Sequence, residues 1–275
     1  MEDKEIKSMV RAGYAKIVKQ GNSCGCSPAS SCCGSTQDAI SKAIGYSDAE
    51  IGAVPEGANL GLGCGNPVAL ASLREGETVL DLGSGAGFDC FLAADRVGKN
   101  GRIIGVDMTP EMIEKARENA EKGNYGNVEF RLGEIENLPV ADNSVDAVIS
   151  NCVINLAQDK TRVFKEAYRA LKPGGRVMVS DIVLLKELPA SIMNSVEAYT
   201  GCIAGALMKD EYLGEINAVG FQEVSVVDET SFPIEYMVND PTAKAVMDNL
   251  ETPPGKVEVI EGSVVSIKVS ALKPS

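Results

Sequence analysis

From residue 78 onward the chain repeats short apolar runs, which are separated by stretches with helical spacing. The runs are rich in Val and Ile, as strands buried on both faces are. They cover residues 78–83, 102–107, 128–133, 145–150 and 176–183. Strands that alternate with helices predict a parallel sheet covered by helices, which is an α/β fold.

Two of the stretches between the runs carry helix signals. Thr109 suits the N-cap of a helix, Pro110 its first position and Glu111 its first turn. The apolar positions of residues 163–171 recur at helical spacing, and the Lys-Pro-Gly-Gly sequence at 172–175 ends that helix. These signals predict helices on the connections between the strands.

The pattern changes toward the N-terminus. Residues 2–20 carry apolar side chains roughly on one face and predict a helix. Residues 21–36 are small, polar and rich in cysteine, and they predict a loop. Residues 37–77 form a mixed segment, for which we expect mainly helical structure.

Beyond the fifth run the pattern predicts further elements. Residues 184–216 favour helical structure, and residues 221–227 and 263–272 favour two more strands. Apolar and polar positions alternate in the last of these strands. We therefore expect it to join the sheet as an antiparallel addition.

Composition excludes several classes of function. The chain has 275 residues, 44% apolar and 24% charged, which is the balance of an ordinary globular protein. Its net charge of −13 argues against nucleic acid and anionic membranes as partners. The chain contains no His, which excludes Ser-His-Asp triads and His-ligated metals. It also lacks Trp, which disfavours a stacking platform for single-stranded nucleic acid.

The N-terminal residues are charged and acidic, without the basic and then apolar order of a signal peptide. No run approaches the length of a membrane span; even the apolar stretch 177–185 contains Asp181. We therefore expect a cytoplasmic protein, and nothing in the pattern requires more than a monomer. Thiols stay reduced in the cytosol, so the 8 cysteines are better interpreted as ligands or redox groups than as structural disulfides.

A glycine-rich turn follows the first run. Gly83, Gly85 and Gly87 are separated by single residues, and Asp81 precedes the first of them by two positions. Glycines let the backbone turn tightly and let a ligand lie against it. A dinucleotide fingerprint has the spacing G-x-G-x-x-G, so a nicotinamide-binding domain is disfavoured. Asp107 closes the second run, where an acid can accept both ribose hydroxyls of a bound nucleoside.

This turn, the acid that closes the second run and the Leu-Lys-Pro-Gly-Gly turn before a later strand resemble the class I S-adenosylmethionine-dependent methyltransferases. The resemblance implies a Rossmann-like α/β fold with a mostly parallel seven-stranded sheet, flanking helices and a small C-terminal region. It also implies that S-adenosylmethionine lies across the carboxyl ends of the strands. A simple α/β turn with a solvated Asp is the alternative, and it leaves the ordered set of five strands unexplained.

The same resemblance assigns residues to the cofactor. The glycine turn and its preceding acid bind it, and Asp107 holds the ribose. Met108 covers one face of the adenine, and Glu134 and Ile135 meet the adenine from the end of the third strand. Asn151, at the end of the fourth strand, lies near the methionine part of the cofactor.

Three separated cysteines are predicted at or near the substrate pocket. Cys152 directly follows the fourth strand, which in this fold lies beside the methyl donor. Cys202 comes after the fifth strand, in a stretch that walls the pocket, and Cys64 lies in a glycine-flanked segment that can bend over the site. Thiolates select soft, thiophilic centres. A single cysteine is more often a small buried hydrophobe, and that is our interpretation of Cys90.

The sequences around these cysteines are similar to the arsenite methyltransferases, strongly over residues 60–225. The similarity includes DLGSGAGFDC, GVDMT, SNCVINL, EAYRALKPGG and GCIAGAL. It implies that Cys64, Cys152 and Cys202 bind As(III), which is the substrate, and that no metal cofactor is needed. The implied activity is methylation of arsenite or its thiol conjugates, in arsenic detoxification.

The chemistry agrees with the residue composition. Trivalent arsenic bound by three thiolates keeps a lone pair, which can attack a sulfonium methyl group without loss of a proton. The absence of His therefore costs the reaction nothing, and the protein supplies alignment and desolvation. Methyl transfer formally oxidises As(III) to As(V), and a pair of cysteines can return two electrons by forming a disulfide. A thioredoxin-type or small-thiol reductant would then reset the enzyme.

The family uses one additional N-terminal cysteine in the redox step, and Cys33 or Cys32 matches its distance from Cys64. Cys24 and Cys26 can capture arsenic, relay electrons or bind zinc. A four-cysteine zinc site is the plainer alternative, but C-x-C combined with C-C lacks the usual zinc-ligand spacing on both sides.

The similarity divides the chain into three parts: an N-terminal helical, cysteine-rich segment (1–60), a cofactor-binding methyltransferase domain with the arsenic site (61–228) and a C-terminal region with the last strand (229–275). Two other functions remain as alternatives. A carbon or oxygen methyltransferase for a quinone- or sterol-like molecule leaves the cysteines unexplained. A thiol-based arsenic sensor without catalysis has no need of the glycine turn and Asp107.

Overall fold

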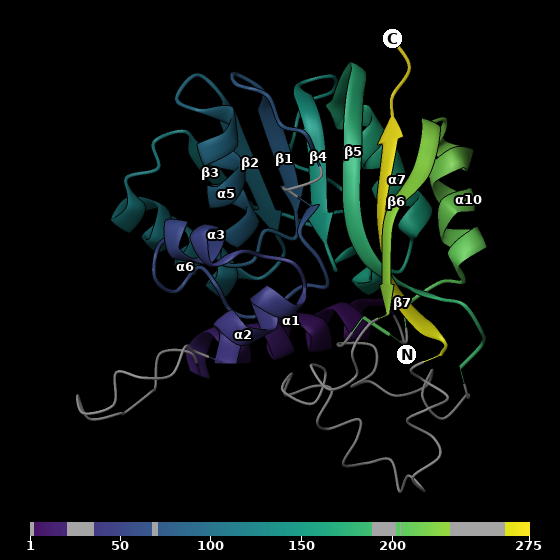
Figure 1. The fold of residues 1–275 in the computed structure, drawn as a ribbon, viewed down its shortest axis with the longest axis horizontal. Coiled ribbons are helices and arrows are strands. Elements are labelled where there is room, and N and C mark those ends of the chain that lie inside the picture. The colour runs from purple at the N-terminus through teal and green to yellow at the C-terminus, as the bar shows by residue number, and fades with distance from the viewer. Residues whose placement is uncertain (1–2, 21–35, 68–70, 189–201, 204, 232–261) are drawn as a thin grey trace, which may run out of the picture.

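The fold is built on a central sheet of seven strands (Figure 1). The computed structural model describes residues 3–20, 36–67, 71–188, 202–203, 205–231 and 262–275. The strands are β1 (Thr78–Leu82), β2 (Arg102–Asp107), β3 (Val128–Leu132), β4 (Val145–Asn151), β5 (Leu171–Leu184), β6 (Gln222–Ser231) and β7 (Val264–Leu272). Their order across the sheet is β3-β2-β1-β4-β5-β7-β6.

The five predicted parallel strands and the two later ones are all present. β1 to β5 pair in parallel, and β7 inserts antiparallel between β5 and β6. The sheet is therefore mixed, and the antiparallel addition expected for the last strand is confirmed. β5 begins at Leu171 rather than at the predicted residue 176, because Leu171 already pairs with Val145 ahead of a register shift.

The helices lie on the connections between strands and before the sheet. They are α1 (Asp3–Gln20), α2 (Thr36–Ala43), α3 (Asp48–Ala53), α5 (Phe88–Val97), α6 (Pro110–Gly123), η1 (Ile154–Leu156), α7 (Lys160–Ala170) and α10 (Lys209–Val219). The predicted helices at 2–20, 109–116 and 163–171 are confirmed. Within the 184–216 stretch, residue 184 is still strand and a helix begins at Lys209. Residues 21–35, 189–201 and 204 lie outside the described part of the chain.

Two apolar layers hold the helices on opposite faces of the sheet, because successive strand side chains point to opposite faces. Val79 packs in the layer that contains α5 and α6, whereas Leu80 packs in the layer that contains α7 and α10. The strands between them are almost fully buried, as parallel strands covered on both faces should be.

A third apolar cluster lies at the carboxyl ends of the parallel strands, where α1 crosses the edge of the sheet (Figure 1). It joins Val10 of α1 to Cys64, Cys202 and residues that follow β4 and β5. Because this cluster contains Cys64 and Cys202, the carboxyl edge of the sheet is the candidate location of the functional site. Among the described residues, no helix is both long and apolar enough to cross a membrane.

Candidate active site

The glycine turn lies between β1 and α5. Gly83, Gly85 and Gly87 have φ angles of 71°, 51° and 95°, a region that L side chains rarely adopt. At Gly85 an added Cβ would find no atom closer than the Met112 sulfur, 4.0 Å away. The backbone there faces open space, so a ligand can lie directly against it.

Asp107 at the end of β2 meets this turn. Its carboxylate accepts hydrogen bonds from the backbone N–H of Gly85 at 3.0 Å and of Thr109 at 2.8 Å. Burial raises the pKa of Asp107, and these hydrogen bonds partly oppose the shift. Asp81 lies behind the turn, where it is buried and accepts a hydrogen bond from the Cys90 thiol at 3.2 Å. The turn and Asp107 are thus brought together, while Asp81 faces α5.

The residues predicted to contact the adenine lie near α1, whereas Asn151 lies behind the Cys64 loop and accepts from the Cys64 N–H at 3.0 Å. Met108 is half-buried against the apolar cluster of the carboxyl edge, and Ile135 is buried. Glu134 forms ion pairs with Lys7 at 2.6 Å and Arg11 at 3.6 Å, both on α1. The helix therefore closes this end of the sheet over the predicted adenine contacts.

The three predicted arsenic ligands converge. Cys152 follows β4 and Cys202 follows β5, and both have positive φ angles, 58° and 64°. The Cys202 thiol donates a hydrogen bond to the carbonyl of Cys152 at 3.0 Å. Hydrogen bonding to Cys202 and Cys64, together with burial, raises the pKa of the Cys152 thiol well above its usual range. Without a ligand the Cys152 thiol therefore keeps its proton at neutral pH.

Cys64 reaches the site on a loop that lies close against the strand ends. Its thiol lies 3.4 Å from the carbonyl oxygen of Ser180 and its carbonyl accepts from the Ser266 hydroxyl at 2.7 Å. A Cβ at Gly63 would lie 2.7 Å from the Asn151 amide nitrogen, and one at Gly65 would lie 2.1 Å from the Ser180 hydroxyl. Only glycine on both sides allows this approach.

A buried acid that the sequence analysis did not assign completes the cluster. One oxygen of Asp181 and the sulfurs of Cys64 and Cys152 all lie within 4.8 Å of one another. Burial raises the pKa of Asp181 to about 7, although a hydrogen bond from Tyr212 and the charge of Lys160 lower it. An acid inside an otherwise apolar strand was the sequence signal for this residue.

The family comparison agrees with this geometry. The methyltransferase domain family matches residues 73–220, which is more than half of the chain and includes the glycine turn, β1 to β5 and Cys152. The chain belongs to the methyltransferase domain family.

Relatives within that family confirm the resemblance seen in the sequence. An arsenite methyltransferase of Halobacterium salinarum is 51% identical over 82% of this chain and 59% of its own length. The human arsenite methyltransferase is 39% identical over 58% of this chain and 44% of its own. The chain therefore spans only about half the length of these relatives.

A solved structure is also similar to this methyltransferase. It is an arsenic(III) S-adenosylmethionine methyltransferase from Chlamydomonas reinhardtii, with a TM-score of 0.64 and 33% sequence identity. The match covers 86% of this chain and 74% of that one. The Rossmann-like methyltransferase fold expected from the sequence is thus confirmed.

Several cysteines of the methyltransferase are not part of the convergent site. Cys24, Cys26, Cys32 and Cys33 lie outside the described residues. Cys90 is fully buried in the core beneath the glycine turn, in agreement with its interpretation as a small hydrophobe. In the described part of the chain, the four cysteines form no disulfide with one another.

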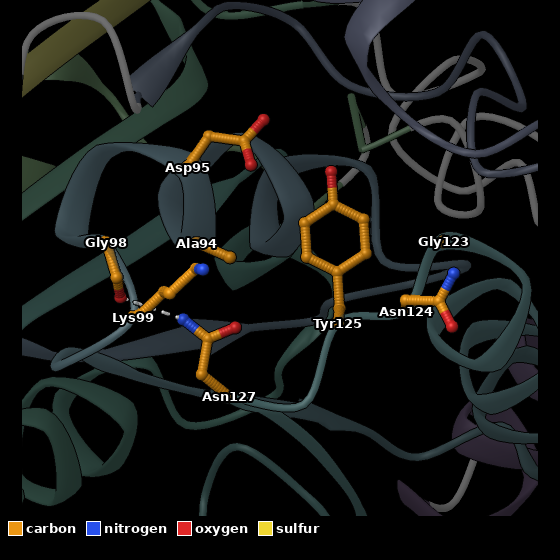
Figure 2. Close-up of a pocket in the computed structure, with 8 residues that line it drawn as sticks. All are labelled: Ala94, Asp95, Gly98, Lys99, Gly123, Asn124, Tyr125 and Asn127. Carbon is orange, nitrogen blue, oxygen red and sulfur yellow. Dashed lines mark hydrogen bonds between the residues drawn. The ribbon is translucent and has the colours of Figure 1, made fainter.

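A hollow lies beside the loops that follow α5 and α6 (Figure 2). It is lined by Ala94, Asp95, Gly98, Lys99, Gly123, Asn124, Tyr125 and Asn127. Asn127 donates a hydrogen bond to the carbonyl of Gly98 across it, at 3.1 Å. None of the predicted cofactor or arsenic residues lines this hollow.

Proposed function

We propose that this methyltransferase transfers methyl groups from S-adenosylmethionine to trivalent arsenic held by Cys64, Cys152 and Cys202. The observation that carries the proposal is the convergence of three thiols, distant in sequence, at the carboxyl edge beside the glycine turn. Soft thiol ligands suit arsenic(III) and have no evident use in a methyltransferase for an organic acceptor. The arsenite methyltransferases among the relatives support the same substrate.

The cofactor fits the residues present at the turn. The open backbone at Gly85 and the carboxylate of Asp107 beside it suit the ribose of a nucleoside. We assign the adenine to Met108, Glu134 and Ile135, and the methionine end to Asn151. Asp81 supports the turn from behind. When bound, S-adenosylmethionine supplies an electrophilic methyl group on a cationic sulfur.

Substrate binding releases no free proton to the solvent. Arsenous acid carries three hydroxyl groups, and each is replaced by one thiol, whose proton leaves with the hydroxyl as water. The raised pKa of Cys152 keeps a proton available for this exchange. The arsenic in the thiolate complex keeps a lone pair, so no general base is needed to activate it. The protein's part is to align the arsenic and to exclude water.

The electron balance requires a reductant. Methylation leaves arsenic formally as As(V), and two thiols that join in a disulfide return two electrons and release two protons. We assign this step to Cys33 or Cys32 together with a thiol of the arsenic site. A thioredoxin-type or small-thiol reductant then reopens the disulfide. This cycle needs reduced thiols, as the cytoplasm maintains them.

The test is product analysis with matched cysteine variants. Reduced protein is incubated with S-adenosylmethionine, arsenite and a thioredoxin system, and methylated arsenic is measured by mass spectrometry. We expect product from the wild type and from Cys90→Ser, and none from Cys152→Ser or Cys202→Ser. The Cys90 variant is the control, because Cys90 is a buried thiol of the same chain outside the site. Bound cofactor without any methylated arsenic would contradict the proposal and would favour an organic acceptor.

A further inference from the structure

A buried hydrogen-bond network lies behind the Cys64 loop and contains two residues to which the reaction gives no role. Tyr46, between α2 and α3, is 3% exposed, and Asp89, in the first turn of α5, is 8% exposed. The Tyr46 hydroxyl donates to one oxygen of Asp89 at 2.7 Å. The Tyr46 ring also packs edge-on against Phe88, with ring centroids 4.8 Å apart. Tyr46 is therefore fixed both by its ring and by its hydroxyl.

The network ends on the side-chain amide of Asn151. The amide nitrogen lies 3.1 Å from Asp89, 2.9 Å from the Tyr46 oxygen and 2.8 Å from the Gly65 carbonyl. The amide oxygen of Asn151 accepts from the backbone N–H of Cys64 at 3.0 Å. One carboxamide thus holds the backbone on both sides of the Cys64 side chain.

Tyr46 and Asp89 decide which way this carboxamide points. A carboxylate only accepts hydrogen bonds, and the Tyr46 hydroxyl directs its hydrogen toward Asp89, so both present lone pairs to Asn151. They therefore attract the amide nitrogen of Asn151 and repel its oxygen. The oxygen is left facing the Cys64 N–H, which donates to it.

The Cys64 loop needs such an external support. Its glycine neighbours restrict the backbone little, so local sequence alone does not fix the thiol. Arsenous acid exchanges three hydroxyl groups and needs all three thiols, whereas methylarsonous acid exchanges only two. Cys152 and Cys202, which contact each other directly, suffice for the second compound.

We propose that Tyr46 and Asp89 are positioning residues for Cys64, which they place through the carboxamide of Asn151. By placing Cys64, which is the third thiol ligand, they favour the binding of substrates that exchange three hydroxyl groups. The substrate part of this inference rests on the proposed function, whereas the placement of Cys64 does not.

The first experiment compares two arsenicals on the full-length reduced protein at pH 8. Burial raises the pKa of Asp89 to about 6, so its carboxyl group is ionised at this pH. For Tyr46→Phe we expect arsenite affinity to fall about tenfold, as for a lost buried hydrogen bond, measured by As–thiolate absorbance. Affinity for methylarsonous acid should change less than about twofold.

Two further variants make the result specific. Tyr125→Phe is the matched control, because Tyr125 lines the hollow of Figure 2. Its hydroxyl lies 3.5 Å from the carbonyl of Ala53 and has no hydrogen bond to Asn151. Asp89→Asn should weaken arsenite binding more than Tyr46→Phe, since it sets one amide NH₂ group against another. If Tyr46→Phe fails to fold, as shown by the absence of a cooperative unfolding transition, the comparison of the two arsenicals is made with Asp89→Asn instead. Equal losses for both arsenicals, or no loss for either, would overturn the proposal.

A second measurement needs no arsenic. In the substrate-free protein, the alkylation rate of Cys64 by iodoacetamide is followed by peptide mass spectrometry, with Cys90 as the internal reference. We expect Tyr46→Phe to speed alkylation of Cys64 about tenfold and to leave Cys90 unchanged. An unchanged Cys64 rate would refute the positioning role, even if the wild type failed to bind arsenite. Failure to bind arsenite with a faster Cys64 rate would instead refute only the proposed function.

Discussion

Asp181 lies in the middle of the candidate arsenic site and yet is buried without a counter-charge in direct contact. Its hydroxyl partner is Tyr212, at 3.0 Å, and Lys160 acts on it only through its charge. Lys160 itself is half-buried, and loss of hydration lowers its pKa. A carboxyl group in such a place is expensive to ionise, because burial removes its hydration.

The free-energy cost of ionising Asp181 predicts that the stability of the folded chain depends on pH. The pKa of Asp181 is raised to about 7 in the folded chain, whereas an unfolded carboxyl group titrates near about 4. The folded state therefore binds more protons between these values, so this group's contribution to stability falls as the pH rises toward 7. Between pH 5 and pH 8 we expect the unfolding free energy of Asp181→Asn to gain about 2 kcal/mol relative to wild type.

Urea unfolding of the arsenic-free protein at the two pH values measures this difference. Asp142→Asn is a suitable control, because it removes one carboxylate from a side chain that is 68% exposed. A difference between Asp181→Asn and wild type that stays constant with pH would contradict the assignment.

At the scale of elements, α1 is held by two kinds of contact that differ in strength. Lys7 and Arg11 pair with Glu134, whose side chain is 42% exposed, and Lys7 also pairs with Glu136 at 3.1 Å. Exposed ion pairs contribute less than about 1 kcal/mol. Val10 is 1% exposed in the apolar cluster of the carboxyl edge, and truncation of such a side chain costs about 2 kcal/mol. The apolar contact is therefore the stronger one.

We expect hydrogen exchange in residues 3–20 to report this ranking. Val10→Ala should speed exchange of the α1 amides about thirtyfold, and Lys7→Ala less than about fivefold. Peptide-level mass spectrometry provides the measurement, with α7 peptides as the internal reference. An effect of Lys7→Ala equal to that of Val10→Ala would mean that charge rather than apolar packing holds the helix.

The elements themselves were largely predictable, because the spacing of apolar residues along the chain shows which side chains of a helix or strand are buried. The strand pattern gave β1 to β5, β6 and β7, and the parallel topology brought the ends of β4 and β5 to one edge, where Cys152 and Cys202 meet. The early start of β5 was missed, because a Lys-Pro-Gly-Gly sequence is typical of a turn between a helix and a strand. In the structure, Leu171 before this sequence already pairs with β4.

The supporting contacts of the site were not predictable in the same way. Tyr46, Asp89 and Asn151 lie on three separate segments, and no periodic pattern relates them. The role of Asp181 depends on Tyr212, which reaches it from a helix 31 residues further along the chain. Hydrogen bonds between distant segments follow from tertiary packing, which a single sequence does not specify.

At the scale of the whole molecule, β7 joins β5 to β6, which no other strand in the described part of the chain connects. It pairs with β5 on one side and β6 on the other, and its buried side chains contribute to both the large core and the carboxyl-edge cluster. Without β7, strands β5 and β6 would each lose a neighbour, and apolar surface on both would meet water.

A chain that ends at residue 261 should therefore lose cooperative unfolding altogether. Urea titration followed by circular dichroism tests this expectation. Removal of only Pro274 and Ser275, which follow the strand, is the control and should leave the transition intact. A cooperative transition in the shorter chain would indicate that the first five strands form a stable unit by themselves.

The hydrogen bond between Ser266 and Cys64 spans 202 positions of the chain. During synthesis on the ribosome, the loop with Cys64 therefore emerges long before the strand that supports it. The supported position of Cys64 can form only after Ser266 has left the exit tunnel. Until then a nascent chain would expose the Cys64 loop without this support, and the three thiols would acquire their shared affinity for a thiophile only once that strand has joined the sheet.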